Sequence, residues 1–441
     1  MKTLTVELKQ HTPLIHFQHS QQGATLRASE VKPKLDRFIL TKLGNGNYQK
    51  GIDAAKNNGW LVGKGEHPAL DYKMRIEASE NKEEYLIASY LSSQKITDLT
   101  RNGINVLAPT PYFAQEKENG TIAKIPNGQD QKNAWNRIRC KGLKHNWTKV
   151  YIRSFSDTLI EEIAGHIQEF FIANNFGTRQ DKGFGSYTVL KGEIKETCYN
   201  VEGAPRTIEL KRNEELLEKA YSIRYRKRLN RNVPINKIFS TITRDYRLLK
   251  SGINDPYAKS KLMLYGRRFK QRWEKKFIKD CFYEYYSNSD GEAYKLKSNA
   301  GRNFSHGIAV SEDYCYLRAL LGLAGQYEFI LENPPFGNDR NKAIITVDGG
   351  EVERFKSPIF FKVIDNTIYM LANEIPREIL NKEFYFVVSI DNDTDPDNQN
   401  DRIEDSINTP ANFNLAEFLE FAMNDSDDVE DNDTQLHYEV F

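Results

Sequence analysis

A glycine-rich basic stretch at residues 174–189, NNFGTRQDKGFGSYTV, has the composition of a loop that binds phosphate. Glycine permits positive φ and lets another molecule approach the main chain closely. Cations beside exposed amides favour phosphate, and aromatic rings can stack on unpaired bases. A tight connection whose aromatic side chains face a core is the alternative interpretation. The binding hypothesis rests on Arg179, Lys182, Gly183, Phe184, Gly185, Ser186 and Tyr187.

Three histidines near the N-terminus, His11, His16 and His19, could move protons in a reaction on RNA. Imidazole titrates near neutral pH, which suits proton transfer between a 2′-hydroxyl and a leaving 5′-oxygen. No lysine or tyrosine partner lies nearby in the sequence. The alternative, which we favour, is that these are strand-edge or loop histidines without a catalytic role.

The tetrapeptide Asn333-Pro334-Pro335-Phe336 resembles the catalytic loop of adenine-N6 methyltransferases, which grips a flipped adenine. Such an enzyme also needs a glycine-rich cofactor turn after its first strand. The nearest match, GFGS at 183–186, follows a predicted helix instead. We therefore expect a proline loop here, no binding of S-adenosylmethionine and no cofactor.

Acidic residues at positions 391, 393, 395 and 397 have the spacing of a calcium-binding loop. That loop requires a glycine at its bend and a glutamate at its twelfth position. Here Pro396 and Arg402 stand at those two positions. The stretch is therefore expected to be a solvated acidic linker, and we expect no metal site.

The net charge of the 441 residues is only +1, but the charges are distributed unevenly. Residues 211–279 contain 21 Lys or Arg against six Asp or Glu, whereas residues 391–441 contain 16 acidic residues against Arg402 alone. The basic segment also interleaves its cations with aromatic residues, a pattern that favours RNA, although a solvated helical hairpin packed on the core would share it. Its candidate RNA-binding residues are Arg224, Arg226, Lys227, Arg228, Arg267 and Arg268.

The remaining composition narrows the class of protein. No run of about 18 apolar residues is present, so we expect no membrane span. The first residues lack the apolar core of a signal peptide, because Glu7 and Lys9 interrupt it. The four cysteines are far apart in the sequence, which argues against a zinc site and suits a reducing cytoplasm.

Hydrophobic spacing predicts the elements that position these residues. For residues 1 to about 195, the spacing predicts a strand, a helix with Pro33 in its first turn, and further strands. A second helix, capped by Ser156 or Asp157, the glycine turn and a last strand follow. This order is compatible with a split β-α-β-β-α-β unit that carries long insertions. Residues 211–286 look mainly helical, residues 314–325 like a buried helix, and the last 18 residues disordered. Strands are expected at 3–8, 149–156, 354–364, 366–372 and 383–390, and helices at 32–43, 156–175 and 414–424.

The glycine stretch also resembles the glycine-rich loop of the RAMP superfamily of CRISPR-associated RNA-binding proteins, in which a helix is followed by an Arg-containing turn and Gly-Phe-Gly-Ser. Residues 6–39, VELKQHTPLIHFQHSQQGATLRASEVKPKLDRFI, are similar to the start of the first subunit of Cmr (type III-B) effector complexes. Residues 353–364, ERFKSPIFFKVI, resemble a Ser-Pro strand of that family's second domain. The helix after Arg27 lacks the family's Arg-Phe-Trp cluster, and the second domain shows no glycine loop of its own.

This resemblance implies an α+β protein of two ferredoxin-like (RRM-like) domains with a basic helical insertion and an acidic C-terminal tail. The expected domains are residues 1–198, 199–290 for the insertion, 291–400, and 401–441 for a partly disordered tail. The implied function is a cytoplasmic, non-catalytic subunit of a type III CRISPR effector that holds guide or target RNA by its backbone and contacts other subunits. The alternatives are a RAMP endoribonuclease using His16 and His19, and a methyltransferase using Asn333.

The resemblance also places four cations, Arg27, Lys32, Lys34 and Arg37, at the first strand-to-helix junction, on the same surface as the glycine loop. Unpaired amides at a helix start favour phosphate. An amphipathic helix with solvated cations is the alternative. If the loop lies against RNA, a bulky residue at Gly185 should weaken binding and leave the fold largely intact.

Overall fold

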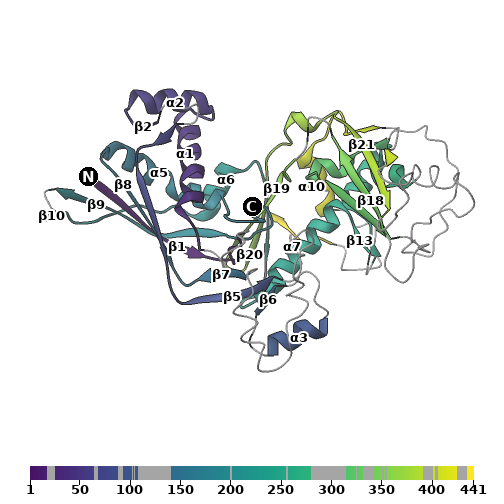
Figure 1. Ribbon diagram of the computed structural model, residues 1–441, viewed down its shortest axis with the longest axis horizontal. Coiled ribbons are helices and arrows are strands. Elements are labelled where there is room, and N and C mark those ends of the chain that lie inside the picture. The colour runs from purple at the N-terminus through teal and green to yellow at the C-terminus, as the bar shows by residue number, and fades with distance from the viewer. Residues whose placement is uncertain are drawn as a thin grey trace, which may run out of the picture. The chain divides into compact units, whose positions relative to one another are not determined.

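In the computed structural model, the elements of the chain belong to two units (Figure 1). One unit comprises Met1–Thr243, Phe360–Leu371 and Glu439–Phe441, and the other Arg244–Ile359 and Ala372–Tyr438. The domain boundaries expected from the sequence stay predictions. The described residues are 1–16, 25–63, 68–87, 93–101, 103, 105–107, 141–198, 201–254, 257–279, 314–323, 325–330, 342–349, 352, 355–390, 401–402, 406–424 and 435–441.

The main sheet of the first unit is antiparallel between all paired neighbours. Its principal strands are β1 (Lys2–Gln10), β4 (Lys73–Ala78), β8 (Thr148–Ser154) and β9 (Tyr187–Cys198). They lie in the order β9-β1-β8-β4, and the short strands β10 (Val201–Glu202) and β11 (Arg206–Thr207) pair with β9. Leu4, Val6 and Leu8 alternate along β1 and are fully buried, which confirms the strand that their spacing predicts.

Two helices pack into the core on this sheet, α1 (Ala28–Leu43) and α5 (Asp157–Ala173). The side chain of Ser156 accepts a hydrogen bond from the amide of Leu159, which confirms the predicted cap of α5. The prediction for Pro33 is wrong: it lies inside α1 rather than in its first turn. The helix begins earlier because the carbonyl of Arg27 accepts the amide hydrogens of Glu30 and Val31.

Smaller elements complete this part of the first unit. A three-stranded sheet has the order β6-β5-β7, and its strands are β5 (Lys82–Ile87), β6 (Asn105–Leu107) and β7 (Lys141–His145). Strand β2 pairs with β3 in antiparallel register, and two further helices are α2 and α3. Their bounds are β2 (Leu61–Val62), β3 (Ala69–Leu70), α2 (Tyr48–Asn57) and α3 (Ser93–Arg101).

A further sheet brings together distant parts of the sequence, in the order β19-β20-β12-β24. Its strands are β12 (Ile223–Arg228), β19 (Ile359–Ile364), β20 (Thr367–Ala372) and β24 (Glu439–Val440). The basic segment is therefore not helical at Ile223–Arg228, because Ile223 and Tyr225 alternate inward in a strand. Residues 435–441, which the sequence predicts as disordered, include the paired strand β24. The helices α6 (Asn213–Ala220) and α7 (Ile235–Lys250) agree with the predicted helical character.

The second unit contains a seven-stranded sheet with the order β15-β16-β23-β21-β18-β17, and β22 pairs with β21. In the range 314–325, predicted as a buried helix, the structure has β16 and the 3₁₀ turn Leu317–Leu321 instead, although Leu317, Leu320 and Leu321 are buried as expected. The strands are β15 (Arg272–Trp273), β16 (Tyr314–Cys315), β17 (Gln326–Ile330), β18 (Lys342–Asp348), β21 (Glu383–Ile390), β22 (Asp401–Arg402) and β23 (Ile407–Asn408). The unit also has α8 (Lys261–Arg268), α10 (Leu415–Asn424), the antiparallel pair of β13 (Ile253–Asn254) and β14 (Tyr257–Ala258), and a 3₁₀ turn at Arg377–Ile379.

Candidate functional site

The glycine segment packs against the residues that follow β1. The amide of Gly185 donates to the carbonyl of Pro13 at 2.9 Å, and the amide of His11 donates to the carbonyl of Ser186 at 2.9 Å. The hydroxyl of Thr12 donates to the carbonyl of Gly183 at 2.7 Å and accepts the amide of Ser186 at 2.9 Å. These hydrogen bonds hold the turn 183–186 against the N-terminal segment.

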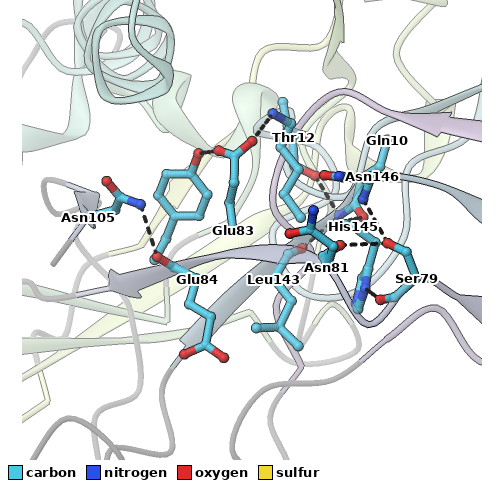
Figure 2. Close-up of polar contacts among 12 residues, drawn as sticks. Gln10, Thr12, Ser79, Asn81, Glu83, Glu84, Asn105, Leu143, His145 and Asn146 are labelled. Atoms are coloured by element: carbon cyan, nitrogen blue, oxygen red, sulfur yellow. Dashed lines mark hydrogen bonds and ion pairs between the residues drawn. The ribbon is translucent and has the colours of Figure 1, made fainter. Parts of the chain in front are cut away.

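A polar network around Gln10 fixes this end of β1 to β7 (Figure 2). The side-chain amide of Gln10 donates to the carbonyls of Leu143 at 2.7 Å and Thr12 at 3.0 Å, and its oxygen accepts the amide of His145 at 2.8 Å. The Nδ1 atom of His145 donates to the carbonyl of Ser79 at 2.8 Å. Burial lowers the pKa of His145, which keeps the ring neutral at pH 7. The network therefore sets the position of Thr12, which in turn holds the glycine turn.

The aromatic side chains of the glycine segment point inward. Phe184 is 1% exposed and stacks on Phe239, with 3.9 Å between ring centroids and 18° between the planes. Tyr187 is fully buried and meets Phe176 edge to face at 5.9 Å. The expectation that either ring is available to stack on a base is wrong, because the core of the first unit already surrounds both.

Gly185 is required by the fold. Its φ is +62°, and a Cβ at this position would collide with the carbonyl oxygen of Phe176 and lie 2.9 Å from a methyl group of Leu14. The hydroxyl of the adjacent Ser186 donates to the carbonyl of Val363 at 2.6 Å. A bulky residue at 185 therefore cannot leave the fold intact, which corrects the expectation from the sequence. Whether the loop also contacts RNA stays a prediction.

Glu30 links the start of α1 to the glycine segment. Its Oε1 atom accepts the amide of Gly177 at 2.7 Å and the ammonium of Lys34 at 3.1 Å. Lys34 also donates to the side-chain oxygen of Gln180 at 3.0 Å. Reasoning from the sequence missed Glu30, although its spacing of four residues from Lys34 on a helix is a recognisable signal. The predicted convergence of α1 with the glycine segment is thus seen for Lys34.

His16 faces the same carboxylate, with its Nε2 atom 3.3 Å from Oε2 of Glu30. Burial is the main reason that the pKa of His16 is lowered; Arg27 and Lys34 lower it further, and Glu30 opposes them. A lysine thus lies close to His16 in space, although none is near it in sequence. His11, by contrast, is buried. Its Nδ1 atom accepts a hydrogen bond from the backbone amide of Asp365 at 3.0 Å, so the ring holds two segments of the fold together.

The other cations of α1 and the loop occupy varied surroundings. Lys32 is paired with Asp36 and lies 3.7 Å from the centre of the Tyr72 ring, whereas Arg37 is exposed. Arg27 precedes the first residue of α1. Arg179 is partly buried, and burial lowers its pKa to about 10. Lys182 lies 3.4 Å from the carboxylate of Asp181.

The candidate cations of the basic segment divide between the two units. Arg224, Arg226, Lys227 and Arg228 lie on β12 in the first unit, and Arg226 contacts two carboxylates, of Glu214 and Glu439, at 2.7 Å each. Arg267 and Arg268 are exposed in the last turn of α8 in the second unit, with Arg268 4.1 Å from the Phe421 ring centre. His19 and Asn333–Phe336 fall outside the described residues. Among the residues that the structure does describe, there is no cluster that could hold a metal ion, and no helix is long and apolar enough to cross a membrane.

Comparison with protein-family models matches residues 1–253 to the Cmr1 N-terminal domain and residues 257–438 to the Cmr1 C-terminal domain. Among solved structures, the chain is similar to apo Cmr1 from Pyrococcus furiosus, with 10% identity, a TM-score of 0.36, and coverage of 91% of this chain and 94% of that one. It is also similar to a chain in the type III-B Cmr-beta complex bound to cognate target RNA and AMPPnP, with 10% identity, a TM-score of 0.36, and coverage of 84% and 94%. No curated protein matches the chain.

Proposed function

Because this chain belongs to the Cmr1 family, we propose that it is a non-catalytic, RNA-binding subunit of a type III CRISPR ribonucleoprotein effector. In this proposal it acts in the cytoplasm beside other effector subunits and holds guide or target RNA by the sugar-phosphate backbone. The family assignment supports the place in an effector. The arrangement of α1 and the glycine segment supports the contact with RNA.

The order of elements in the first unit supports a ferredoxin-like domain. Strand β1, helix α1, strands β4 and β8, helix α5 and strand β9 come in this order along the chain, with smaller elements inserted between α1 and β4 and between β4 and β8. The antiparallel order β9-β1-β8-β4 is that of a split β-α-β-β-α-β unit, with the first strand between the last and the third. We include this fold in the proposal, and a second ferredoxin-like domain stays a prediction.

The observation that carries the RNA-binding proposal is that the start of α1, with Arg27 and Lys34, lies against the glycine segment. Glu30 and Lys34 bridge the two segments through Gly177 and Gln180. Arg27 lies close enough to His16 in this cluster to lower its pKa. Such a surface suits phosphate binding without base recognition, since Lys and Arg neutralise phosphates in any sequence.

Arg37→Glu tests the surface of α1, because Arg37 is exposed on this helix and its guanidinium lies 5.8 Å from the centre of the Tyr48 ring. Arg153→Glu is the matched control. It makes the same charge change on the face of β8 opposite to the buried Val150 and Ile152, and hence away from the helices.

Binding of a fluorescein-labelled single-stranded RNA of about 20 nucleotides is measured across a salt series. Arg37→Glu is expected to weaken binding. It is also expected to make the slope of the logarithm of the binding constant against the logarithm of the salt concentration shallower by about 0.7 for each phosphate that the protein no longer neutralises. Arg153→Glu is expected to change both much less. Equal effects in the two variants would mean that α1 is not the binding surface, and only the net charge of the protein matters.

One observation favours a second function, the RAMP endoribonuclease. His16 has a carboxylate partner in Glu30, and Lys34 lies beside that carboxylate. A neutral imidazole next to a lysine could accept a proton from a 2′-hydroxyl. We favour the non-catalytic function, because Lys34 and Glu30 are already paired with each other and with the glycine segment.

A further inference from the structure

Residues Glu439–Phe441 lie along the outer edge of β12. Strand β24 pairs with β12 in antiparallel register, with Val440 opposite Tyr225 and Glu439 opposite Arg226. In the sheet order β19-β20-β12-β24, the edge of β12 that faces away from β20 is thus covered by this short segment. The basic strand, with its candidate RNA-binding cations, is covered by residues from the acidic end of the sequence.

The covering segment places a carboxylate beside two of the arginines of β12, Arg226 and Arg228. The carboxylate of Glu439 accepts a hydrogen bond from Nε of Arg226 at 2.7 Å, and the carboxylate of Glu214 accepts one from Nη1 of the same guanidinium at 2.7 Å. Nε of Arg228 lies 3.9 Å from the Glu439 carboxylate. The side chain of Arg226 is only 18% exposed. An arginine held between two carboxylates cannot offer its full charge to a phosphate.

An aromatic side chain anchors the segment. Phe441 meets Tyr369 edge to face at 5.1 Å, and the guanidinium of Arg226 lies 5.7 Å from the Phe441 ring centre. The ring packs against a cluster of buried residues that includes Leu216 and Leu371. The segment is therefore attached by a strand pairing, by the carboxylate of Glu439, by the Phe441 ring, and by the Phe441 carbonyl, which accepts a hydrogen bond from Nε of Arg224 at 3.3 Å.

The strand pairing and the ion pair are each weak enough to exchange. The pairing spans two residues on each strand, Val440 is 70% exposed, and the Glu439 side chain is 57% exposed. Exposed ion pairs contribute little, since water and salt screen them. The segment stays in place because it is tethered, which raises its effective concentration to the order of millimolar. A polyanion that presents several phosphates at once can compete with such a contact.

We propose that Glu439–Phe441 is a releasable cover, and that the edge of β12 beneath it is a masked phosphate-binding surface formed by Arg224, Arg226 and Arg228. An RNA backbone displaces Glu439 and pairs with these arginines in its place. The masking of RNA binding rests on the proposed function. The pairing of β24 with β12 does not depend on it.

Glu439→Gln tests the cover, because it removes the charge and keeps the size of the side chain. It is expected to tighten binding of the labelled single-stranded RNA about two- to fivefold, the range that an exposed ion pair can contribute. It is also expected to steepen the salt slope by about 0.7 for each additional phosphate that the arginines neutralise. The tighter binding is expected to vanish when Arg226→Gln is added. The control is Glu420→Gln, which removes one negative charge from an exposed position of α10 in the second unit and is expected to change nothing.

Amide hydrogen exchange provides a measurement of the cover that needs no RNA. Residues Tyr225–Arg226 and Glu439–Val440 are expected to be protected in the wild type and to exchange faster in Glu439→Gln. In the wild type, added RNA is expected to accelerate exchange at Glu439–Val440. If the wild type binds RNA and Glu439→Gln binds it no more tightly, the cover is refuted and the proposed function stands. If neither protein binds RNA, both fail, whatever the exchange shows.

Discussion

Replacing Gly185 by alanine adds a single methyl group at the point where the glycine turn contacts the segment after β1. The left-handed conformation at φ +62° costs a residue with a Cβ about 1–2 kcal/mol. The new Cβ collides with the carbonyl of Phe176, and overpacking of this kind costs about 1–3 kcal/mol. Relief by movement weakens the hydrogen bond from the Phe176 amide to the Gly185 carbonyl, which is worth about 0.5–1.5 kcal/mol.

These contributions together predict a loss of about 3–6 kcal/mol from the first unit, a large part of the 5–15 kcal/mol typical of a folded domain. Differential scanning calorimetry measures the loss, because it can resolve separate transitions for the two units. A domain of about 200 residues melts roughly 2–4 °C lower for each kcal/mol lost. We therefore expect the affected transition to fall by roughly 6–24 °C.

Gly165→Ala is the matched control for this experiment. Gly165 is exposed within α5, and no atom lies within 4 Å of a Cβ placed on it. Alanine is favoured over glycine inside a helix by about 0.5–1 kcal/mol, so this variant is expected to melt slightly higher. If Gly185→Ala has the same melting temperature as the wild type, the turn does not have the packed, left-handed conformation described above, and the reasoning from burial and backbone conformation is refuted.

Two further predictions concern titration and catalysis. His166, and after it Lys42, stabilise the carboxylate of Glu169 and lower its pKa to about 2 from the ordinary value of 4.5. Because the pKa of Glu169 is depressed in the folded protein, this stabilisation is present above about pH 4.5 and is lost as the pH falls toward 2. In Glu169→Gln, the free energy of unfolding should therefore depend less on pH between these values. Parallel curves of unfolding free energy against pH for the two proteins would contradict the assignment. Incubation of the wild type with labelled RNA, without divalent metal, is expected to give no cleavage; discrete products that disappear in His16→Ala would favour the endoribonuclease.

Local pattern was sufficient to predict the framework of the first unit. The alternation of Leu4, Val6 and Leu8 predicts a strand because side chains of a strand point to opposite faces. Apolar spacing around Ile163 and Ile167 predicts α5, and Ser156 marks its start, because a cap depends only on residues a few positions away. The resemblance of short motifs at residues 6–39 and 174–189 was likewise sufficient to indicate the family that the domain matches show.

The position of the glycine segment in the core depended on partners far away in the sequence. Phe184 is buried because Phe239 stacks on it, and Ser186 is held by the carbonyl of Val363. No pattern within 174–189 reveals those partners, so the same residues were equally compatible with an exposed loop.

Tertiary structure also decided what the charges do. Glu30 joins α1 to Gly177, which lies 147 positions away in the sequence. Glu439 covers Arg226 on β12, from which it is separated by 213 positions. Composition predicts that a basic segment and an acidic tail attract each other, since opposite charges do so at any separation in the chain. Which carboxylate meets which arginine is set by strand pairing and by the packing of Phe441, and these exist only once the sheet has formed.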